Sequence, residues 1–203
     1  MTEEGWRLVS IFISALMIFS TIAYLWMTPR PKEQFFQFYI LGKEKMISDY
    51  YPGETGEIPL STPVKWYLGV TNFMGSVQYV LVKVKLGNAH TIPPNETTGT
   101  PADAPVIYEF RSFLSDNETW EFPFFWEISD YRVEDNNVYI SLVINNKSVG
   151  FAEIGAEEGR NFRMIFELWI YNQENGDFSF GWYAGGEKRI CWLQMWFNAT
   201  IPG

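Results

Sequence analysis

Hydrophobic residues follow two different patterns along this chain, one before residue 30 and one after it. From Leu8 to Met27 the chain carries no charged residue. At about 1.5 Å per residue, a helix over this run spans about 30 Å, the thickness of the hydrocarbon core of a membrane. Trp6 precedes the run and Trp26 lies near its end, as aromatic residues do at membrane interfaces. The pattern predicts a single membrane-spanning helix over residues 8–27.

A cleaved signal peptide is the alternative interpretation of this run. The apolar part of a signal peptide covers only about 7–15 residues and precedes a small-residue cleavage site. Here the run is longer and ends in Tyr-Leu-Trp-Met, and the helix breakers Pro29 and Pro31 follow it. We therefore expect an uncleaved anchor that crosses the membrane once.

Beyond residue 33 the apolar residues alternate with polar ones. In the segment 137–144, for example, Val138, Ile140, Leu142 and Ile144 share one face. Such alternation is typical of a strand with one face on a core and the other toward water. The same pattern occupies residues 64–70, 79–86 and 162–171. Turn signals separate these segments, and their spacing predicts a mainly β fold, an antiparallel immunoglobulin-like β-sandwich of about seven to nine short strands.

These patterns divide the chain into a tip at residues 1–7, the helix at 8–27, a linker at 28–33 and a β-sandwich domain at 34–203. Basic residues flanking the helix are too balanced to set its orientation. N-glycosylation acceptor motifs decide it instead, and they begin at Asn95, Asn117, Asn146 and Asn198. Because N-linked glycans are added outside the cytoplasm, we expect a cytoplasmic tip and an extracytoplasmic β domain. The alternative for any one site is a polar loop residue without sugar.

Composition removes several classes of function. The 203 residues carry a net charge of −9, whereas nucleic-acid binding calls for clustered Lys and Arg. His90 is the only His and Cys191 the only Cys. This excludes most zinc sites, Cys/His catalysis and a disulfide within the chain. We therefore expect no nucleic-acid partner, no cofactor and no metal.

Candidate catalytic and ligand residues are correspondingly few. Asp130, Glu134 and Asp135, with Asn136 and Asn137, form either a hard-cation site or a solvated acidic hairpin turn, and we expect the turn. No pair of carboxylates stands out for glycoside hydrolysis, and no phosphate-binding loop occurs. Cys191 alternates with apolar residues, which predicts a buried, inert thiol. We expect that the protein is not an enzyme.

The segment from Gly87 to Ala104 is longer than most loops. It contains Pro93, Pro94, Pro101 and the acceptor Asn95. A loop of this kind is either functional or simply mobile, and we expect a mobile, sugar-bearing loop.

Aromatic and small residues supply the candidate interfaces. Trp120, Phe122, Phe124 and Trp126 alternate along one predicted strand, and Pro123 suits an edge position there. The strand belongs either to the core or to an exposed strip for another subunit or for sugar rings. Further interface candidates are Trp192 and Trp196 near the C-terminus, and Ser10 and Ser14 on one face of the predicted membrane helix.

Several separated blocks resemble a known pattern. They are Phe35-Gln-Phe-Tyr-Ile-Leu-Gly, Tyr50-Tyr-Pro-Gly-Glu-Thr-Gly-Glu, Trp66-Tyr-Leu-Gly-Val-Thr-Asn-Phe-Met-Gly, Tyr79-Val-Leu-Val-Lys-Val, Arg163-Met-Ile-Phe-Glu-Leu-Trp-Ile-Tyr and Arg189-Ile-Cys-Trp-Leu-Gln-Met-Trp-Phe. In order and spacing they resemble the archaeal domain-of-unknown-function family 1616, over residues 34–203. Asn72-Phe73-Met74 stands where Asn-His-Glu is typical of the family. The resemblance implies an archaeal, membrane-tethered, extracytoplasmic β domain and no particular activity.

Together these features favour a non-catalytic, single-pass accessory or structural subunit of an archaeal membrane or cell-surface protein complex. Its expected partners are membrane lipid, N-linked glycans and other membrane or cell-surface protein subunits. The alternative function is a cell-surface carbohydrate-binding or surface-layer-associated module that uses exposed aromatic residues.

Overall fold

The computed structural model describes residues 3–28 and 33–201. Met1 and Thr2 of the predicted tip, residues 29–32 of the predicted linker, and residues 202–203 lie outside the described residues. The chain divides into two compact units, Met1–Lys32 and Glu33–Gly203. The second is called the β unit below.

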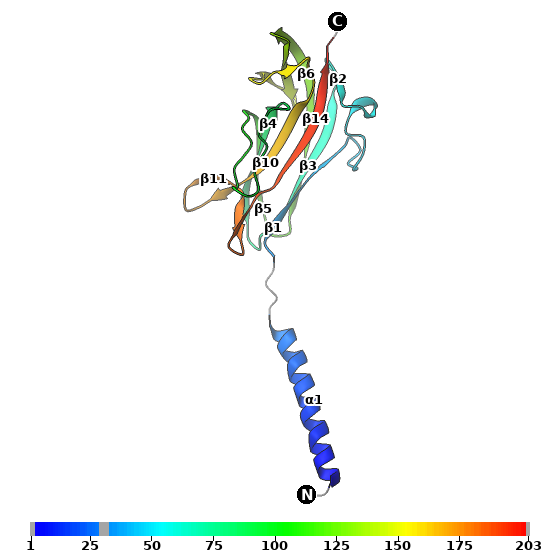
Figure 1. The fold of residues 1–203 in the computed structure, drawn as a ribbon, viewed down its shortest axis with the longest axis vertical. Coiled ribbons are helices and arrows are strands. Elements are labelled where there is room, and N and C mark those ends of the chain that lie inside the picture. The colour runs from blue at the N-terminus through cyan, green and yellow to red at the C-terminus, as the bar shows by residue number, and fades with distance from the viewer. Residues whose placement is uncertain (1–2, 29–32, 202–203) are drawn as a thin grey trace. The chain divides into compact units, whose positions relative to one another are not determined.

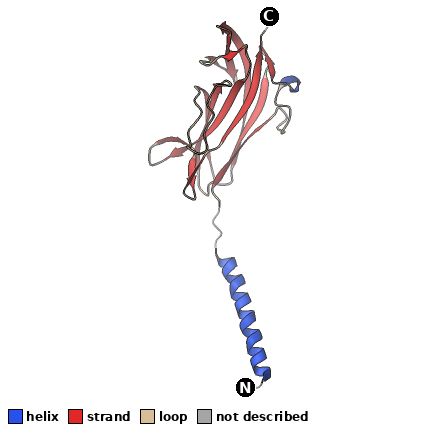
Figure 2. Cartoon of the chain, in the orientation of Figure 1, coloured by secondary structure: helices blue, strands red, loops and turns tan. Residues whose placement is uncertain are grey.

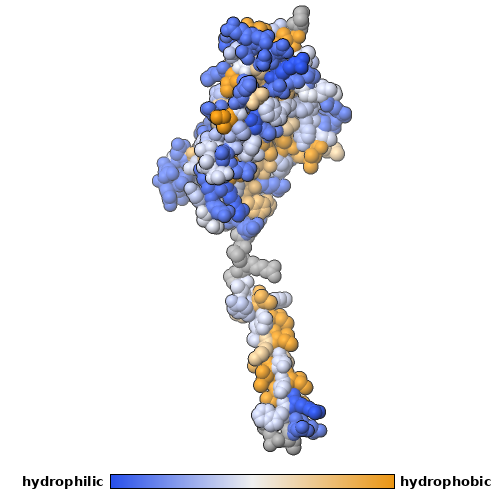
Figure 3. All heavy atoms as spheres, in the orientation of Figure 1, coloured by the Kyte–Doolittle hydropathy of each residue, from blue (hydrophilic) through white to orange (hydrophobic). Residues whose placement is uncertain are grey.

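The first unit is a single helix, α1 (Glu3–Met27), which begins before the predicted span and ends with it. It is long and apolar enough to cross a membrane, and none of the described helix residues is buried. Apolar side chains are visible along its length in Figure 3. The hydroxyl groups of Ser10 and Thr21 donate to the carbonyl oxygens of Trp6 and Met17, at 3.0 and 2.8 Å. These bonds satisfy polar groups that have no water partner inside a lipid bilayer.

The regular secondary structure of the β unit is almost entirely strand, as Figures 1 and 2 show. They are β1 (Phe35–Leu41), β2 (Glu57–Pro59), β3 (Val64–Phe73), β4 (Gln78–Gly87), β5 (Val106–Leu114), β6 (Thr119–Glu134), β7 (Asn137–Ile144), β8 (Lys147–Phe151), β9 (Ala156–Glu157), β10 (Phe162–Asn172), β11 (Asp177–Phe180), β12 (Trp182–Ala184), β13 (Glu187–Arg189) and β14 (Trp192–Thr200). A short 3-10 helix, η1 (Pro52–Glu54), precedes β2. The prediction of a mainly β fold is confirmed, and the four alternating segments correspond to β3, β4, β7 and β10.

Two large sheets and one small one make up the unit. The first sheet has the order β1-β3-β6-β7-β8, with β9 also paired to β7. The second has the order β2-β14-β10-β4-β5, with β11 also paired to β10, and β12 and β13 form a separate hairpin. Among the described strands every pairing is antiparallel except that of β2 with β14, which is parallel. The prediction of a wholly antiparallel sandwich is therefore corrected at this edge.

Apolar side chains from the inner faces of the two large sheets form one core. Aromatic rings connect the sheets directly. The ring of Phe166 on β10 lies 6.2 Å from Trp66 on β3 and 5.1 Å from Phe124 on β6, and Trp126 lies 4.7 Å from Phe197 on β14. Rings of this size bury a large apolar area each, so they dominate the packing of the unit.

Strand register defines two ends of the β unit. Phe35 pairs with Phe73, Thr71 with Thr119 and Gln78 with Leu114, so the turns after β3 and β5 lie at the end that carries Gln34. At the other end, β6 and β7 are joined through Asp135 and Asn136. These are called the Gln34 end and the Asp135 end.

Candidate functional site

The aromatic residues from Trp120 to Trp126 belong mostly to the core of the β unit. Phe122, Phe124 and Trp126 are 6%, 0% and 1% exposed. Trp120 is half-buried and stacks on Phe122 with ring centroids 4.0 Å apart. This segment therefore belongs mainly to the core, and the alternative prediction of an exposed strip is wrong. Pro123 lies on the half of β6 that pairs with β3 but extends past the end of β7. Proline is tolerated there because it has no N–H to donate and no described strand lies on that side.

Trp192 and Trp196 instead lie on the outer face of β14. Trp196 is 41% exposed, and the Arg163 guanidinium lies 4.9 Å from its ring and 6.0 Å from that of Trp192. Gln194, between the two indoles, accepts a hydrogen bond from Arg163 Nε. Burial lowers the pKa of Arg163 from its ordinary value. Trp192, Gln194 and Trp196 form a partly exposed surface, the Trp196 strip, with an amide between the two rings and the buried Arg163 guanidinium beneath them.

A buried ion pair holds the long loop between β4 and β5 against the second sheet. Lys85 Nζ lies 3.1 Å from Glu167 Oε2, and both side chains are buried. The pair clamps the backbone of Ala102, because Lys85 donates to its carbonyl oxygen at 2.8 Å and Glu167 accepts from its N–H at 2.6 Å. Arg163 adds a bond of 3.2 Å to the carbonyl oxygen of Thr91. These contacts contradict the expectation of a mobile loop.

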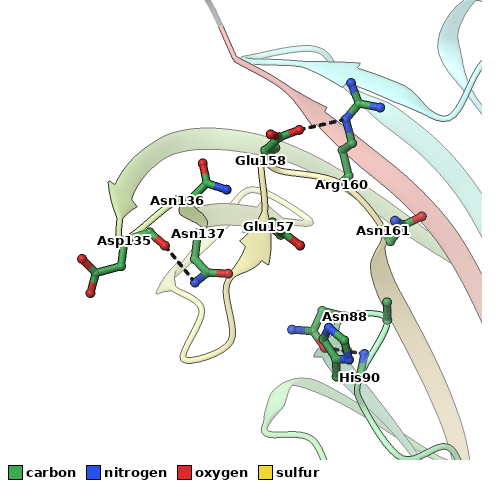
Figure 4. Close-up of a pocket in the computed structure, with 10 residues that line it drawn as sticks. Asn88, His90, Asp135, Asn136, Asn137, Glu157, Glu158, Arg160 and Asn161 are labelled. Atoms are coloured by element: carbon green, nitrogen blue, oxygen red, sulfur yellow. Dashed lines mark hydrogen bonds and ion pairs between the residues drawn. The ribbon is translucent and has the colours of Figure 1, made fainter.

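A polar pocket of about 510 Å³ lies at the Asp135 end. Figure 4 shows that its side chains come from the turn after β4, the β6–β7 hairpin and the segment around β9. Asn88 donates to the Gly155 carbonyl oxygen at 2.8 Å and accepts from the His90 backbone N–H at 2.9 Å. The pocket suits hydrogen bonding to a polar ligand. Sequence reasoning did not group these residues, because three separate segments supply them.

The candidate cation ligands lie in and beside a tight hairpin turn. Asp135 and Asn136 are the two central residues of a tight hairpin, with φ angles of 46° and 67°. Positive φ at both positions is the requirement of a type I′ turn, which Asp and Asn tolerate well. Within residues 3–28 and 33–201, no group of three His, Cys, Asp or Glu side chains is placed to hold a metal ion. Asp135 and Asn136 thus form the hairpin turn that we expect, whereas Asp130 and Glu134 lie on β6 before it.

The four acceptor asparagines differ in how their side chains are engaged. Asn95, Asn117 and Asn146 are exposed and lie in turns outside the strands, where Asn117 Nδ2 donates to the neighbouring Asp116 Oδ2 at 2.8 Å. Asn198 lies within β14, donates through Nδ2 to Glu57 Oε1 at 2.7 Å and accepts from the Asn161 backbone N–H at 2.7 Å. Its amide nitrogen, the atom that would carry a sugar, therefore lies within a paired strand and contacts Glu57.

The remaining predicted residues fall into two environments. Ser10 and Ser14 are exposed on α1. Cys191 is a free, partly buried thiol between β13 and β14. Burial raises the pKa of this thiol to about 11, so it stays protonated and poorly nucleophilic at neutral pH.

An aromatic groove that the sequence did not reveal lies at the Gln34 end, on the outer face of the second sheet. Its volume is about 730 Å³, and it is lined by Ser76, Val77, Gln78, Tyr79, Phe113, Tyr171 and Gln173. Tyr79 stacks on Phe113 with ring centroids 4.2 Å apart and lies 5.0 Å from Phe178. This surface, the Tyr79 groove, combines residues from β4, β5 and β10, and no single segment shows an unusual pattern that would have identified it.

The second sheet ends at β5, whose partner within residues 33–201 is β4 alone. Tyr108 and Phe110 face the core from this strand but stay half-buried, whereas Val84 and Val82, their partners on β4, are fully buried. The Phe110 ring lies 4.6 Å from Phe122. The core is therefore incompletely covered along the β5 edge.

No protein-family model matches the chain, and no curated protein matches it. Among solved structures, it is similar to a CARDB domain from Pyrococcus furiosus in complex with di-metal ions, with 7% identity, 85% of this chain and 94% of that chain covered, and a TM-score of 0.39. It is also similar to the sporulation control protein Spo0M from Bacillus subtilis, with 10% identity, 84% and 50% covered, and a TM-score of 0.35. A β-glucosidase from Listeria innocua matches with 8% identity, 83% and 17% covered, and a TM-score of 0.38. These low scores carry no argument about function, and the resemblance to family 1616 stays a prediction.

Proposed function

We propose that this chain is a non-catalytic accessory or structural subunit of an archaeal membrane or cell-surface protein complex. In this proposal α1 crosses the membrane once, residues 1–7 are cytoplasmic, and the β unit is an immunoglobulin-like, glycosylated extracytoplasmic domain. The apolar, unburied surface of α1 supports the anchor, because a helix of this composition is stable in lipid and unstable in water.

The open β5 edge is the observation that carries the proposal. An edge strand presents a row of backbone N–H and C=O groups that a strand of another chain can pair with. Here the edge also leaves Tyr108 and Phe110 half-buried. A strand added beside β5 would complete both the hydrogen-bond ladder and the apolar cover. We therefore expect the partner subunit to bind by extending the second sheet.

Purification of the full chain from its native membrane in mild detergent tests this function. We expect a second chain to co-purify in stoichiometric amount. Tyr108→Lys places a charge at the inner side of the edge strand, a device that natural proteins use to block strand addition, and should release the partner while leaving the β unit folded.

Tyr183→Lys is the matched control, because Tyr183 is exposed on β12, away from this edge. It should retain the partner. A wild-type chain that purifies alone as a monomer would contradict the proposed function.

A second candidate function, a carbohydrate-binding or surface-layer-associated module, is favoured by the Trp196 strip. Two indole rings separated by the exposed Gln194 amide offer flat apolar faces together with a hydrogen-bonding group, the combination that small-ligand sites use for orientation and specificity. In this case the purified monomer should be retained on a glycan affinity column, and Trp196→Ala should abolish retention. Retention that is unchanged by this substitution would contradict the assignment.

A further inference from the structure

Two large apolar side chains, Val77 and Phe113, form an exposed rim of the Tyr79 groove. Val77 and Phe113 are 64% and 66% exposed. The Phe113 ring is held in place, because Tyr79 stacks on it and the Tyr171 and Phe178 rings lie 5.9 and 5.0 Å from Tyr79. An ordered apolar patch of this kind marks an interaction surface.

The groove lies where the β unit begins. Gln34 donates through Nε2 to the carbonyl oxygen of Met74 at 3.1 Å, and Met74 belongs to the β3–β4 turn that supplies Ser76 and Val77 to the groove. The Gln34 carbonyl oxygen in turn accepts from Trp182 Nε1 at 3.4 Å. The first residues of the β unit are thus tied to the turn that forms the rim.

The length of the chain bounds how far this rim can lie from the membrane if α1 is anchored as proposed. Six peptide units join Thr28, just after α1, to Gln34. An extended chain covers at most about 3.5 Å per residue, which gives about 21 Å in all. This tether keeps the lipid surface close to the Gln34 end at all times. A partner in bulk solvent is not tethered to the β unit in this way.

The chemistry of the rim also suits a lipid surface. The phenol rings of Tyr are favoured at the level of the lipid headgroups, where an apolar body meets water, and apolar side chains such as Phe insert at the boundary between headgroups and acyl chains. Gln78 and Gln173 supply polar groups at the same rim. The nearby Arg111 lies 5.5 Å from the Phe178 ring and pairs with Glu109 at 2.7 Å, while Glu118 and Glu174 are exposed at this end. The surface therefore has no excess of basic residues for anionic lipids.

We propose that the Tyr79 groove docks on the headgroup region of the bilayer that holds α1, through apolar contact and without attraction to anionic lipid. This inference rests on the proposed membrane anchoring. It assigns to the β unit a second, non-covalent contact with the membrane, which holds its Gln34 end against the lipid.

Quenching by spin-labelled lipid tests the contact. Cys191→Ala removes the native thiol, and single cysteines are then placed at Val77→Cys on the rim, Val133→Cys as the control and Ile13→Cys on α1. Val133 is 58% exposed and lies near the Asp135 end. Each full chain carries a nitrobenzoxadiazole probe on its cysteine and is reconstituted into phosphatidylcholine vesicles containing doxyl-labelled chains.

We expect strong quenching at position 13, clear quenching at 77 and little at 133. Phe113→Ser should reduce quenching at 77 several-fold, and raising the salt concentration should leave it unchanged. Quenching at 13 with equally weak signals at 77 and 133 would overturn the docking proposal and leave the anchor intact. Weak quenching at all three positions would overturn the anchor and the docking together. Shielding of position 77 only when a second chain is bound would make the groove a protein interface and also reject the proposal.

Discussion

Two buried tryptophans show how a single hydrogen bond distinguishes otherwise similar core residues. Trp66 and Trp126 are both almost fully buried, and their rings lie 5.3 Å apart. Trp66 Nε1 donates to the carbonyl oxygen of Tyr50. Trp126 Nε1 is a buried donor with no hydrogen-bond partner among the described residues. A buried donor without a partner costs free energy that a phenyl ring does not.

We therefore predict that Trp66→Phe destabilises the β unit more than Trp126→Phe does. Both substitutions remove the same atoms from the core, but only the first leaves a carbonyl oxygen unpaired. The difference in the free energy of unfolding should be about 1–3 kcal/mol. Urea unfolding of the full chain in mild detergent, followed by far-ultraviolet circular dichroism, measures it. An equal loss of unfolding free energy in the two variants would show that the hydrogen bond from Trp66 Nε1 makes no net contribution to stability.

Position in the fold also separates the glycosylation acceptors. Asn198 lies within β14, and its amide bonds to Glu57 and to the Asn161 backbone N–H, so a sugar there would crowd the pairing of β2 with β14. We predict sugar at one or more of Asn95, Asn117 and Asn146, and none at Asn198. Mass spectrometry of glycopeptides from the native protein checks both parts. A bare polypeptide mass would also remove the main argument for an extracytoplasmic β unit.

At the scale of elements, the sequence was most informative where alternation was long and regular. The strands β3, β4, β7 and β10 follow directly from it. Short strands such as β9 and β12 contain too few residues to show a period, which is why the expected number of strands was too small. The parallel pairing of β2 with β14 depends on contacts between distant segments, which no local pattern encodes.

The same limit applies to the candidate surfaces. Alternation placed Trp120, Phe122, Phe124 and Trp126 on one face, but it does not say whether that face is inside or outside. The Tyr79 groove was missed because its residues come from different strands and become neighbours only through register. Alternation within residues 79–86 and 162–171 also predicts that Lys85 and Glu167 face water, although they are buried together.

The Lys85–Glu167 ion pair should stabilise the β unit and the loop between β4 and β5. Removing one partner leaves an uncompensated buried charge, so Lys85→Met or Glu167→Leu alone should cost about 3–5 kcal/mol. The double variant should be clearly less unstable than either single one. Glu167→Leu and the double variant also remove the acceptor of the Ala102 N–H, so this amide should exchange its hydrogen faster in both, measured by hydrogen–deuterium exchange. Lys85→Met removes only the bond to the Ala102 carbonyl oxygen and should change this exchange less.

The exposed pair Arg111–Glu109, at 2.7 Å, is the control. Because water screens such a pair, Arg111→Met should cost less than about 1 kcal/mol. Single Lys85 and Glu167 variants as stable as this control would contradict a structural role for the buried pair.

At the scale of the whole molecule, each unit contains the interactions that hold it together. The core is formed by residues of the β unit alone, and α1 contributes no buried residue. Deleting residues 1–33 keeps Gln34 and its bonds to Met74 and Trp182. We predict that the remaining chain is soluble without detergent, with a circular dichroism spectrum dominated by strand. A mainly helical spectrum, or a chain that aggregates unless detergent is present, would contradict this. The second result would mean that the apolar rim around Val77 and Phe113 cannot stay in water, and that the β unit needs a covering surface as soon as its anchor is removed.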